Sequence, residues 1–223
     1  MKKKKFIVVL LMILCSTIII GFIYVEQKWG VKKLWDSYFP NGKTVVILDA
    51  GHGDYDPGCG TGEPYEKDIT LKIVKKVQRQ LEEQGMVVIL TREKDRFISL
   101  GDRVRCSRIY NGDVFVSVHL NWAENKEAYG IETYCNEILN ADSVSLANAI
   151  QKEVLNETDS KDREVHPESD FYVVRNSKVP SCLVEVGFLS AKEEGKKLKE
   201  DKYQKKIANG ITKGIEHYLQ QKE

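Results

Sequence analysis

Apolar residues recur at every fourth position in long segments of the chain, and this spacing predicts amphipathic helices. In residues 67–84, Ile69, Ile73 and Val77 share one side, and Gly85 follows as a C-cap. The last apolar segment of the chain repeats the same period. The four segments predicted as helices are residues 67–84, 99–110, 142–156 and 202–219.

Short apolar runs rich in β-branched residues alternate with these segments and predict strands. The runs are residues 44–48, 86–91, 114–118, 130–134, 171–174 and 182–186. Strands that alternate with long helical patterns are typical of a covered, largely parallel sheet. We therefore expect an α/β fold: a single domain with a twisted, mostly parallel mixed sheet of about six strands, covered by helices on both faces.

The N-terminus has a different pattern, in which lysines at positions 2–5 precede an uncharged apolar stretch, residues 6–25. A helix of this length spans roughly 30 Å, the thickness of a bilayer core. Because the run lacks a small-residue cleavage site, we expect a signal anchor, with a cleaved signal peptide and secretion as the alternative. The lysines should stay cytoplasmic, which places the rest outside. The expected organisation is an anchor over 1–25, a membrane-proximal linker over 26–43 and one folded domain over 44–220.

Composition narrows the function further. With 34 basic and 33 acidic residues, the net charge is +1, which does not indicate a nucleic-acid partner. Outside the cytoplasm, the four cysteines that follow the apolar stretch either form disulfides or remain free thiols. Cys135 and Cys182 lie in apolar runs, which favours buried free thiols.

Three predicted strands end in, or contain, an unexpected polar residue. His52 follows the first strand between two glycines, His119 follows the third, and Glu185 lies within the last. The carboxyl ends of parallel strands open into a common crevice, where functional groups gather. A carboxylate among apolar neighbours, as at Glu185, is rarely buried without a charged partner or a metal.

Glu66, at the start of the first predicted helix, has two interpretations. It either interacts favourably with the helix dipole, or it is a metal ligand beside the strand ends. Two histidines and one carboxylate with an open position are typical of catalytic zinc. The separations match no zinc finger, so spacing alone leaves a metal site and dispersed structural roles as alternatives.

Four segments, in this order, resemble the signatures of zinc-dependent N-acetylmuramoyl-L-alanine amidases of the cell-separation, sporulation and germination type. They are VVILDAGHGDYDPGCGTGEPYEKDITLKI, VVILTREKDRFISLGDRV, DVFVSVHLNW and VPSCLVEVGFLS. The resemblance runs from about residue 44 to residue 219, so it covers the whole domain. It implies an exported bacterial enzyme that acts on peptidoglycan at the outer face of the membrane or in the cell wall.

The resemblance also implies a cofactor and a reaction. One zinc ion per chain is expected on His52, Glu66 and His119, with Glu185 as the catalytic carboxylate that moves a proton from water to the leaving amine. The bond cleaved is the amide between the lactyl group of N-acetylmuramic acid and L-alanine of the stem peptide. Two other functions stay open: a zinc peptidase acting within the stem peptide, and a non-catalytic wall-binding scaffold.

Several polar residues near these motifs have two interpretations each. Arg92 and Arg103 fall on motif positions and are expected either in buried ion pairs or in contact with substrate. Asn121 either binds substrate or caps a turn. Glu132 is expected to support the site structurally. Cys59 is either a packing residue or a fourth, inhibitory zinc ligand.

Regulation is only partly visible in the sequence. Some relatives carry a helix that blocks the zinc, but the segment 135–141 between the fourth strand and the next helix is too short for one. Control is therefore expected from location, expression or an activating partner protein. By analogy with similar spore-cortex enzymes, a role in sporulation or germination is expected. The oligomeric state does not follow from the sequence.

Overall fold

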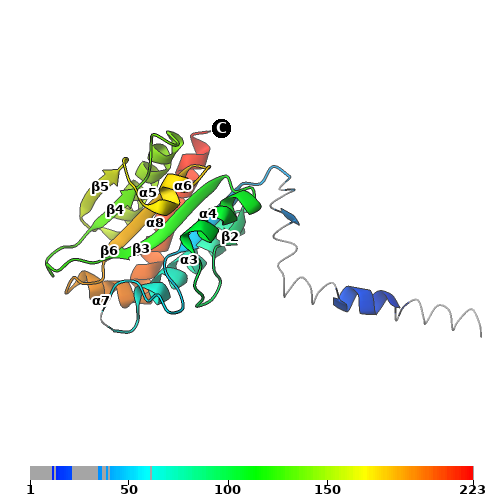
Figure 1. Ribbon diagram of the computed structural model, residues 1–223, viewed down its shortest axis with the longest axis horizontal. Helices are drawn as coiled ribbons and strands as arrows, with labels where there is room; N and C mark the ends of the chain where they lie inside the picture. The colour runs from blue at the N-terminus through cyan, green and yellow to red at the C-terminus, as the bar shows by residue number, and fades with distance from the viewer. Residues whose placement is uncertain are drawn as a thin grey trace, which may run out of the picture.

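The computed structural model describes residues 12, 14–21, 35–36, 39, 41–60 and 62–222 (Figure 1). The expected anchor over residues 1–25 and linker over 26–43 lie largely outside the described residues. Residues 14–21 are helical. Among the described residues, no helix is long and apolar enough to cross a membrane.

A six-stranded mixed sheet forms the centre of the domain (Figure 1). Its strands lie in the order β2-β1-β3-β6-β4-β5, and all neighbours are parallel except β4 and β6, which are antiparallel. Consequently β1, β3 and β6 end at the same edge. The strand bounds are β1 Val45–Ala50, β2 Val87–Leu90, β3 Val114–Asn121, β4 Ile131–Tyr134, β5 Asp162–His166 and β6 Ser181–Phe188.

Helices cover both faces of the sheet. On one face, α3 (Glu66–Glu83), α5 (Asp142–Thr158) and α8 (Asp201–Gln220) pack over the larger apolar cluster, which also includes Leu198 of α7 (Glu194–Lys199). On the other face, which Figure 1 shows in front, α4 (Leu100–Ile109) and α6 (Tyr172–Asn176) cover a smaller cluster. The buried strands are apolar on both faces because both are covered.

The predicted fold class is confirmed, but two of its elements differ. Residues 171–174 were expected to form a strand and belong instead to the start of α6, where Val173 and Val174 are buried. A short apolar run without periodicity is compatible with either structure. The sixth strand is β5, which the pattern did not predict because its sequence, DREVH, is mostly charged. It forms at the sheet edge by pairing with β4.

Two glycines let α8 approach α5 closely on the larger cluster. A Cβ atom at Gly210 would lie 2.4 Å from Cα of Val154, and one at Gly214 would lie 2.4 Å from Cα of Ile150. Both clashes are with backbone atoms, so no side-chain rotation relieves them. The contact between the two helices therefore requires glycine at both positions.

We predict that Gly210→Ala destabilises the domain, although alanine is the better helix former by about 1 kcal/mol. Overpacking at the interface should lower the free energy of unfolding by about 1–3 kcal/mol. Urea denaturation of the two proteins measures this. Lys205→Ala, on the exposed side of the same helix, is the control and should change stability little. A Gly210→Ala variant as stable as the wild type would contradict the close packing.

Candidate metal centre and active site

The sheet topology brings four of the predicted site residues together at one edge. His52 follows the end of β1, and His119 lies near the end of the adjacent strand β3. Glu185 of β6 is directly opposite His119 in the strand register. Glu66 is the first residue of α3, the helix that follows the β1 loop. These segments are far apart in the sequence, and only the parallel order of β1, β3 and β6 joins them.

The glycines beside His52 are required by close packing. His52 itself has a φ of 62°, in the left-handed region that a non-glycine residue adopts only at a cost. A Cβ atom at Gly51 would lie 2.4 Å from the His119 ring, and one at Gly53 would lie 2.2 Å from the carbonyl oxygen of Arg96. The absence of side chains thus lets the loop fold against β3, which turns the His52 ring toward His119.

His52, Glu66 and His119 form a group whose ligand atoms all lie within 4.8 Å of one another. Glu66 Oε1 is 3.1 Å from Nε2 of His52 and 3.0 Å from Nδ1 of His119. The two imidazole rings are nearly perpendicular, with centroids 4.9 Å apart. Two ring nitrogens and a carboxylate oxygen that converge on one point are the donor set of a catalytic zinc site, so the residues fit this metal.

Neighbouring groups fix the orientation of these side chains. Asp56 Oδ2 lies 2.8 Å from Nδ1 of His52, on the side of the ring away from Glu66. The two oxygens of Glu66 accept hydrogen bonds from the backbone N–H groups of Leu120 and Cys59. A carboxylate on the second nitrogen of a ligand histidine is a common feature of metal sites. Asp56 was not singled out from the sequence, because an aspartate in a glycine-rich loop is equally typical of a turn.

The charges within the group stabilise one another. Burial by itself would raise the pKa of Glu66, but hydrogen bonds from His119 and His52 outweigh it and hold that pKa well below its usual range. Burial would likewise lower the pKa values of the two histidines, and Glu66 reverses this for both. Without these partners, Glu66 could not remain ionised at 2% exposure.

A buried ion pair holds the loop that carries His52. Arg103 Nη1 lies 2.7 Å from Oδ1 of Asp49, and the same guanidinium donates to the carbonyl oxygens of Ala50 and His52. Asp49 is fully buried and also accepts hydrogen bonds from Thr91 and Ser117. The expected ion pair is therefore present for Arg103.

Arg92 contacts backbone oxygens instead of forming the expected ion pair. Its buried guanidinium donates to the backbone oxygens of Ala50, Gly51 and Lys67, and no carboxylate pairs with it among the described residues. Arg92 and Arg103 thus both bind the backbone around the His52 loop. A direct role for either in substrate binding stays a prediction.

Glu185 is a half-buried carboxylate, and one of its two oxygens is unused. Its Oε2 atom is inaccessible to solvent and has no hydrogen-bond partner. Burial raises the pKa of Glu185 to about 7, with His119 opposing the shift and Glu66 and Glu132 adding to it. A carboxyl group that exchanges a proton near neutral pH, beside a candidate metal centre, is typical of a catalytic acid or base.

Glu132 links this carboxylate to the outer strands of the sheet. It faces Glu185 across the β4–β6 pair. Its oxygens accept hydrogen bonds from the Asn121 amide and, at 3.0 Å, from Arg163 Nε. Asn121 also accepts a hydrogen bond from the N–H of Trp122, the next residue in the chain, so its amide contacts both Glu132 and the following loop; a role in substrate binding stays a prediction. The structural role expected for Glu132 agrees with these contacts.

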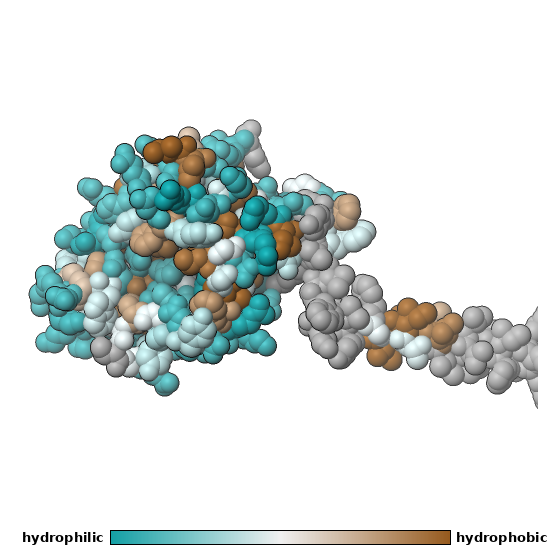
Figure 2. Space-filling model, in the orientation of Figure 1, coloured by the Kyte–Doolittle hydropathy of each residue, from teal (hydrophilic) through white to brown (hydrophobic). Residues whose placement is uncertain are grey.

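A cleft of about 420 Å³ opens onto the group between α4 and α6. His52, His119 and Glu185 line its floor, and Phe97, Leu100, Phe171 and Tyr172 stand at its rim with large exposed fractions. Figure 2 shows apolar residues in the middle of this face among hydrophilic ones. The cleft is large enough for part of a polymeric substrate beside the buried polar group.

The cysteines take no part in this group. All five are free, and Cys135 and Cys182 are buried, as their apolar surroundings predicted. The Cys59 thiol donates to the carbonyl oxygen of Leu120, and burial raises its pKa well above the usual range. Cys59 therefore packs against the larger apolar cluster and is not a member of the histidine–glutamate group.

Comparison with known proteins assigns the domain to a family. The family model described as N-acetylmuramoyl-L-alanine amidase matches residues 46–217. The germination-specific N-acetylmuramoyl-L-alanine amidase of Bacillus subtilis is 30% identical over 224 residues, and the alignment covers 94% of each chain.

Solved structures agree with this assignment. An N-acetylmuramoyl-L-alanine amidase from Clostridium difficile 630 superimposes with a TM-score of 0.77 at 37% identity, over 81% of this chain and 99% of that one. The CwlD amidase of Clostridioides difficile, solved in complex with the GerS lipoprotein, gives a TM-score of 0.76 at 37% identity, over 80% of this chain and 99% of that one. The protein is therefore a hydrolase that belongs to the N-acetylmuramoyl-L-alanine amidase family.

Proposed function

We propose that this domain cleaves the amide between the lactyl group of N-acetylmuramic acid and L-alanine of the stem peptide, with one zinc ion held by His52, Glu66 and His119. The observation that carries the proposal is the buried, unpartnered oxygen of Glu185 beside that group. Most buried carboxylate oxygens in proteins have a hydrogen-bond partner, so an unpartnered one at the floor of a cleft indicates a group that a ligand or water uses. Here its partner is the water that attacks the amide.

The residues have distinct roles in this reaction. Zinc in such a site polarises the amide carbonyl and makes water a better nucleophile at neutral pH. Glu185 accepts the proton of the attacking water and delivers it to the nitrogen of the departing alanine. Its pKa of about 7 lets the same group act as base and then as acid. Glu132 and Asn121 hold the neighbouring sheet surface in place.

The setting of the enzyme is also a proposal. Its relatives include cell-wall, germination-specific and sporulation-specific amidases, which favours an exported enzyme of the cell wall with a role in germination or sporulation. We propose residues 1–25 as the anchor, 26–43 as the linker and 44–220 as the catalytic domain. The complex of CwlD with a lipoprotein supports an activating partner for this chain as well.

Glu185→Gln should abolish hydrolysis while leaving zinc bound, because glutamine keeps the shape but cannot exchange the proton. We expect a loss of about 10²–10⁴-fold in rate, measured by mass spectrometry of products from purified peptidoglycan. Glu124→Gln, on an exposed loop, is the matched control and should retain full activity. Stem peptides that begin with alanine identify the amidase; shortened stems would indicate a peptidase. If zinc-loaded wild type forms no product, the enzyme does not act without a partner. If the protein binds no zinc, the proposed catalytic function is contradicted.

Asp56→Asn should weaken zinc binding by about 10–100-fold, because the amide no longer orients and polarises the His52 ring. Competition with a chelator of known affinity measures the change. Asp54→Asn is the control, since its exposed side chain lies in the same loop and makes no contact with the ring. Equal zinc affinity in the two variants would contradict the role given to Asp56.

The raised pKa of Glu185 predicts a pH dependence in the metal-free protein. A carboxyl group whose pKa is higher in the folded protein than in the unfolded chain makes the fold less stable as pH rises. The loss begins near the unfolded pKa of about 4.3 and is complete above the folded pKa. Metal-free Glu185→Gln should therefore be more stable than metal-free wild type at pH ~8, by up to about 3–4 kcal/mol, and equally stable at pH ~4. Urea denaturation at the two pH values tests this. If the difference in unfolding free energy between the two proteins does not grow with pH, burial does not destabilise the ionised Glu185 carboxylate.

A further inference from the structure

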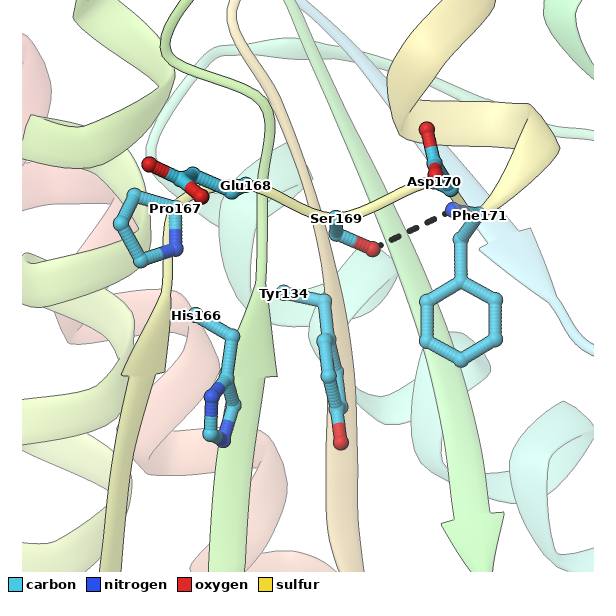
Figure 3. A pocket seen from close by; sticks show the side chains of 7 residues that line it. All are labelled: Tyr134, His166, Pro167, Glu168, Ser169, Asp170 and Phe171. Atoms are coloured by element: carbon cyan, nitrogen blue, oxygen red, sulfur yellow. Dashed lines mark hydrogen bonds between the residues drawn. The ribbon is translucent and has the colours of Figure 1, made fainter.

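A shallow pocket lies beside the catalytic cleft, over strands β4 and β5 (Figure 3). Its volume is about 690 Å³, and Phe171 lines both this pocket and the cleft. The rings of Tyr134 and His166 stack, with centroids 4.7 Å apart and planes 23° apart, and the ring of Phe171 stands perpendicular to Tyr134 at 4.9 Å. We call these three residues the aromatic shelf. Nothing in the reaction described above uses it.

The aromatic shelf begins next to the catalytic carboxylate. In the register of β4 and β6, Glu132 is opposite Glu185 and Tyr134 is opposite Leu183, two residues away. His166 is opposite Tyr134 on β5, one strand further out. Since neighbouring strands are about 4.8 Å apart, the shelf extends roughly 5–10 Å sideways from β6. This distance corresponds to one or two sugar rings of the polymer.

The charges of the pocket distinguish the two arms of the substrate. Its lining includes two carboxylates, Glu168 and Asp170, and no lysine or arginine. Figure 3 shows both on the loop above the rings, with the Ser169 hydroxyl between them. Asp170 is partly compensated by Arg175, whose Nη1 atom lies 3.5 Å from its Oδ1, so Glu168 is the carboxylate that would repel the free carboxylates of a stem peptide. The repeating sugars carry hydroxyl and N-acetyl groups, which can donate to these carboxylates.

Flat apolar rings with carboxylates at the edge suit a sugar chemically. The C–H face of a pyranose packs on an aromatic ring, while its hydroxyl groups point outward to polar side chains. Phe171 is 45% exposed and the His166 side chain is 43% exposed, so both present ring surface to a ligand. Glu132 lies beneath both rings: its Oε2 is 3.6 Å from His166 Nε2, which makes no hydrogen bond among the described residues, and burial and Glu132 together raise the pKa of Tyr134 to about 12.

We propose that the aromatic shelf of Tyr134, His166 and Phe171 binds the glycan strand of peptidoglycan next to the amide that is cleaved. This inference rests on the proposed function, because it places one arm of that substrate. In this arrangement the stem peptide extends from the candidate metal centre on the side away from Glu168 and Asp170. The enzyme would thereby bind substrates with sugar rings adjoining the reacting unit more tightly than a muramoyl peptide that lacks them.

Binding of separated substrate arms tests the proposal. The full chain carrying Glu185→Gln is titrated with a peptide-free tetrasaccharide of alternating N-acetylglucosamine and N-acetylmuramic acid and, separately, with free stem peptide, and NMR reports the shifts. We expect the tetrasaccharide to shift resonances of the aromatic shelf. His166→Ala and Phe171→Ala should each weaken its binding about five- to tenfold. Tyr129→Ala removes a comparably exposed ring that lines neither this pocket nor the cleft, and it should change the binding less than twofold.

Kinetics of the otherwise unaltered enzyme provide the second readout. His166→Ala should raise KM for glycan-linked substrate about five- to tenfold, while hydrolysis of a muramoyl peptide without further sugars changes less than twofold. A misfolded variant would lose both activities, so unfolding does not imitate the result. The proposal is overturned if the stem peptide alone shifts the resonances of the aromatic shelf, if both arms shift them equally, or if neither arm shifts them. A wild type that binds the tetrasaccharide on the shelf but cleaves no amide would contradict the proposed function and leave the glycan site standing.

Discussion

The contact of the Glu66 carboxylate with two imidazole rings is the interaction on which the site depends. One oxygen of this nearly inaccessible side chain lies about 3 Å from both His52 and His119. A carboxylate buried there requires compensating charge, whether from protonated histidines or from a metal. The requirement draws together the loop after β1, the end of β3 and the start of α3. Asp56, Arg92 and Arg103 hold the His52 loop in this arrangement.

The fold meets that requirement with rigid supports rather than with the ligands alone. The Asp49–Arg103 ion pair and the Arg92 guanidinium bind the backbone of the His52 loop from beneath. Because the loop is fixed, His52 can be held in a left-handed conformation that a free chain would avoid. The same edge of the sheet presents Glu185 on the adjacent strand, where burial gives it a pKa suited to proton transfer. The two histidines and Glu185 thus come from three adjacent parallel strands, while α3 supplies Glu66 and α4 supplies Arg103.

The sequence pattern singled out the four central residues because each interrupts an apolar strand or begins a helix beside one, but their spacing left the role open and only the family resemblance proposed it. Asp56 could not be found this way, since its role depends on a loop that brings it to Nδ1 of His52. Strand β5 was missed because its charged side chains show no alternation, and only pairing with β4 makes it a strand. The prediction of a strand at Phe171–Val174 was wrong for the opposite reason. Its apolar residues suit a strand, but they pack as one turn of helix over β6. Long-range pairing decided both cases.

The central claim is that zinc binds between His52, Glu66 and His119 and next to Glu185. Crystals of the zinc-loaded protein, measured on both sides of the zinc absorption edge, test it most directly. We expect one strong anomalous peak within bonding distance of Nε2 of His52, Nδ1 of His119 and the Glu66 carboxylate, about 2.0–2.2 Å from each, with Glu185 nearby and not among the ligands. A peak elsewhere, or zinc ligated by Cys59 or Glu185 in place of one of the three, would contradict it.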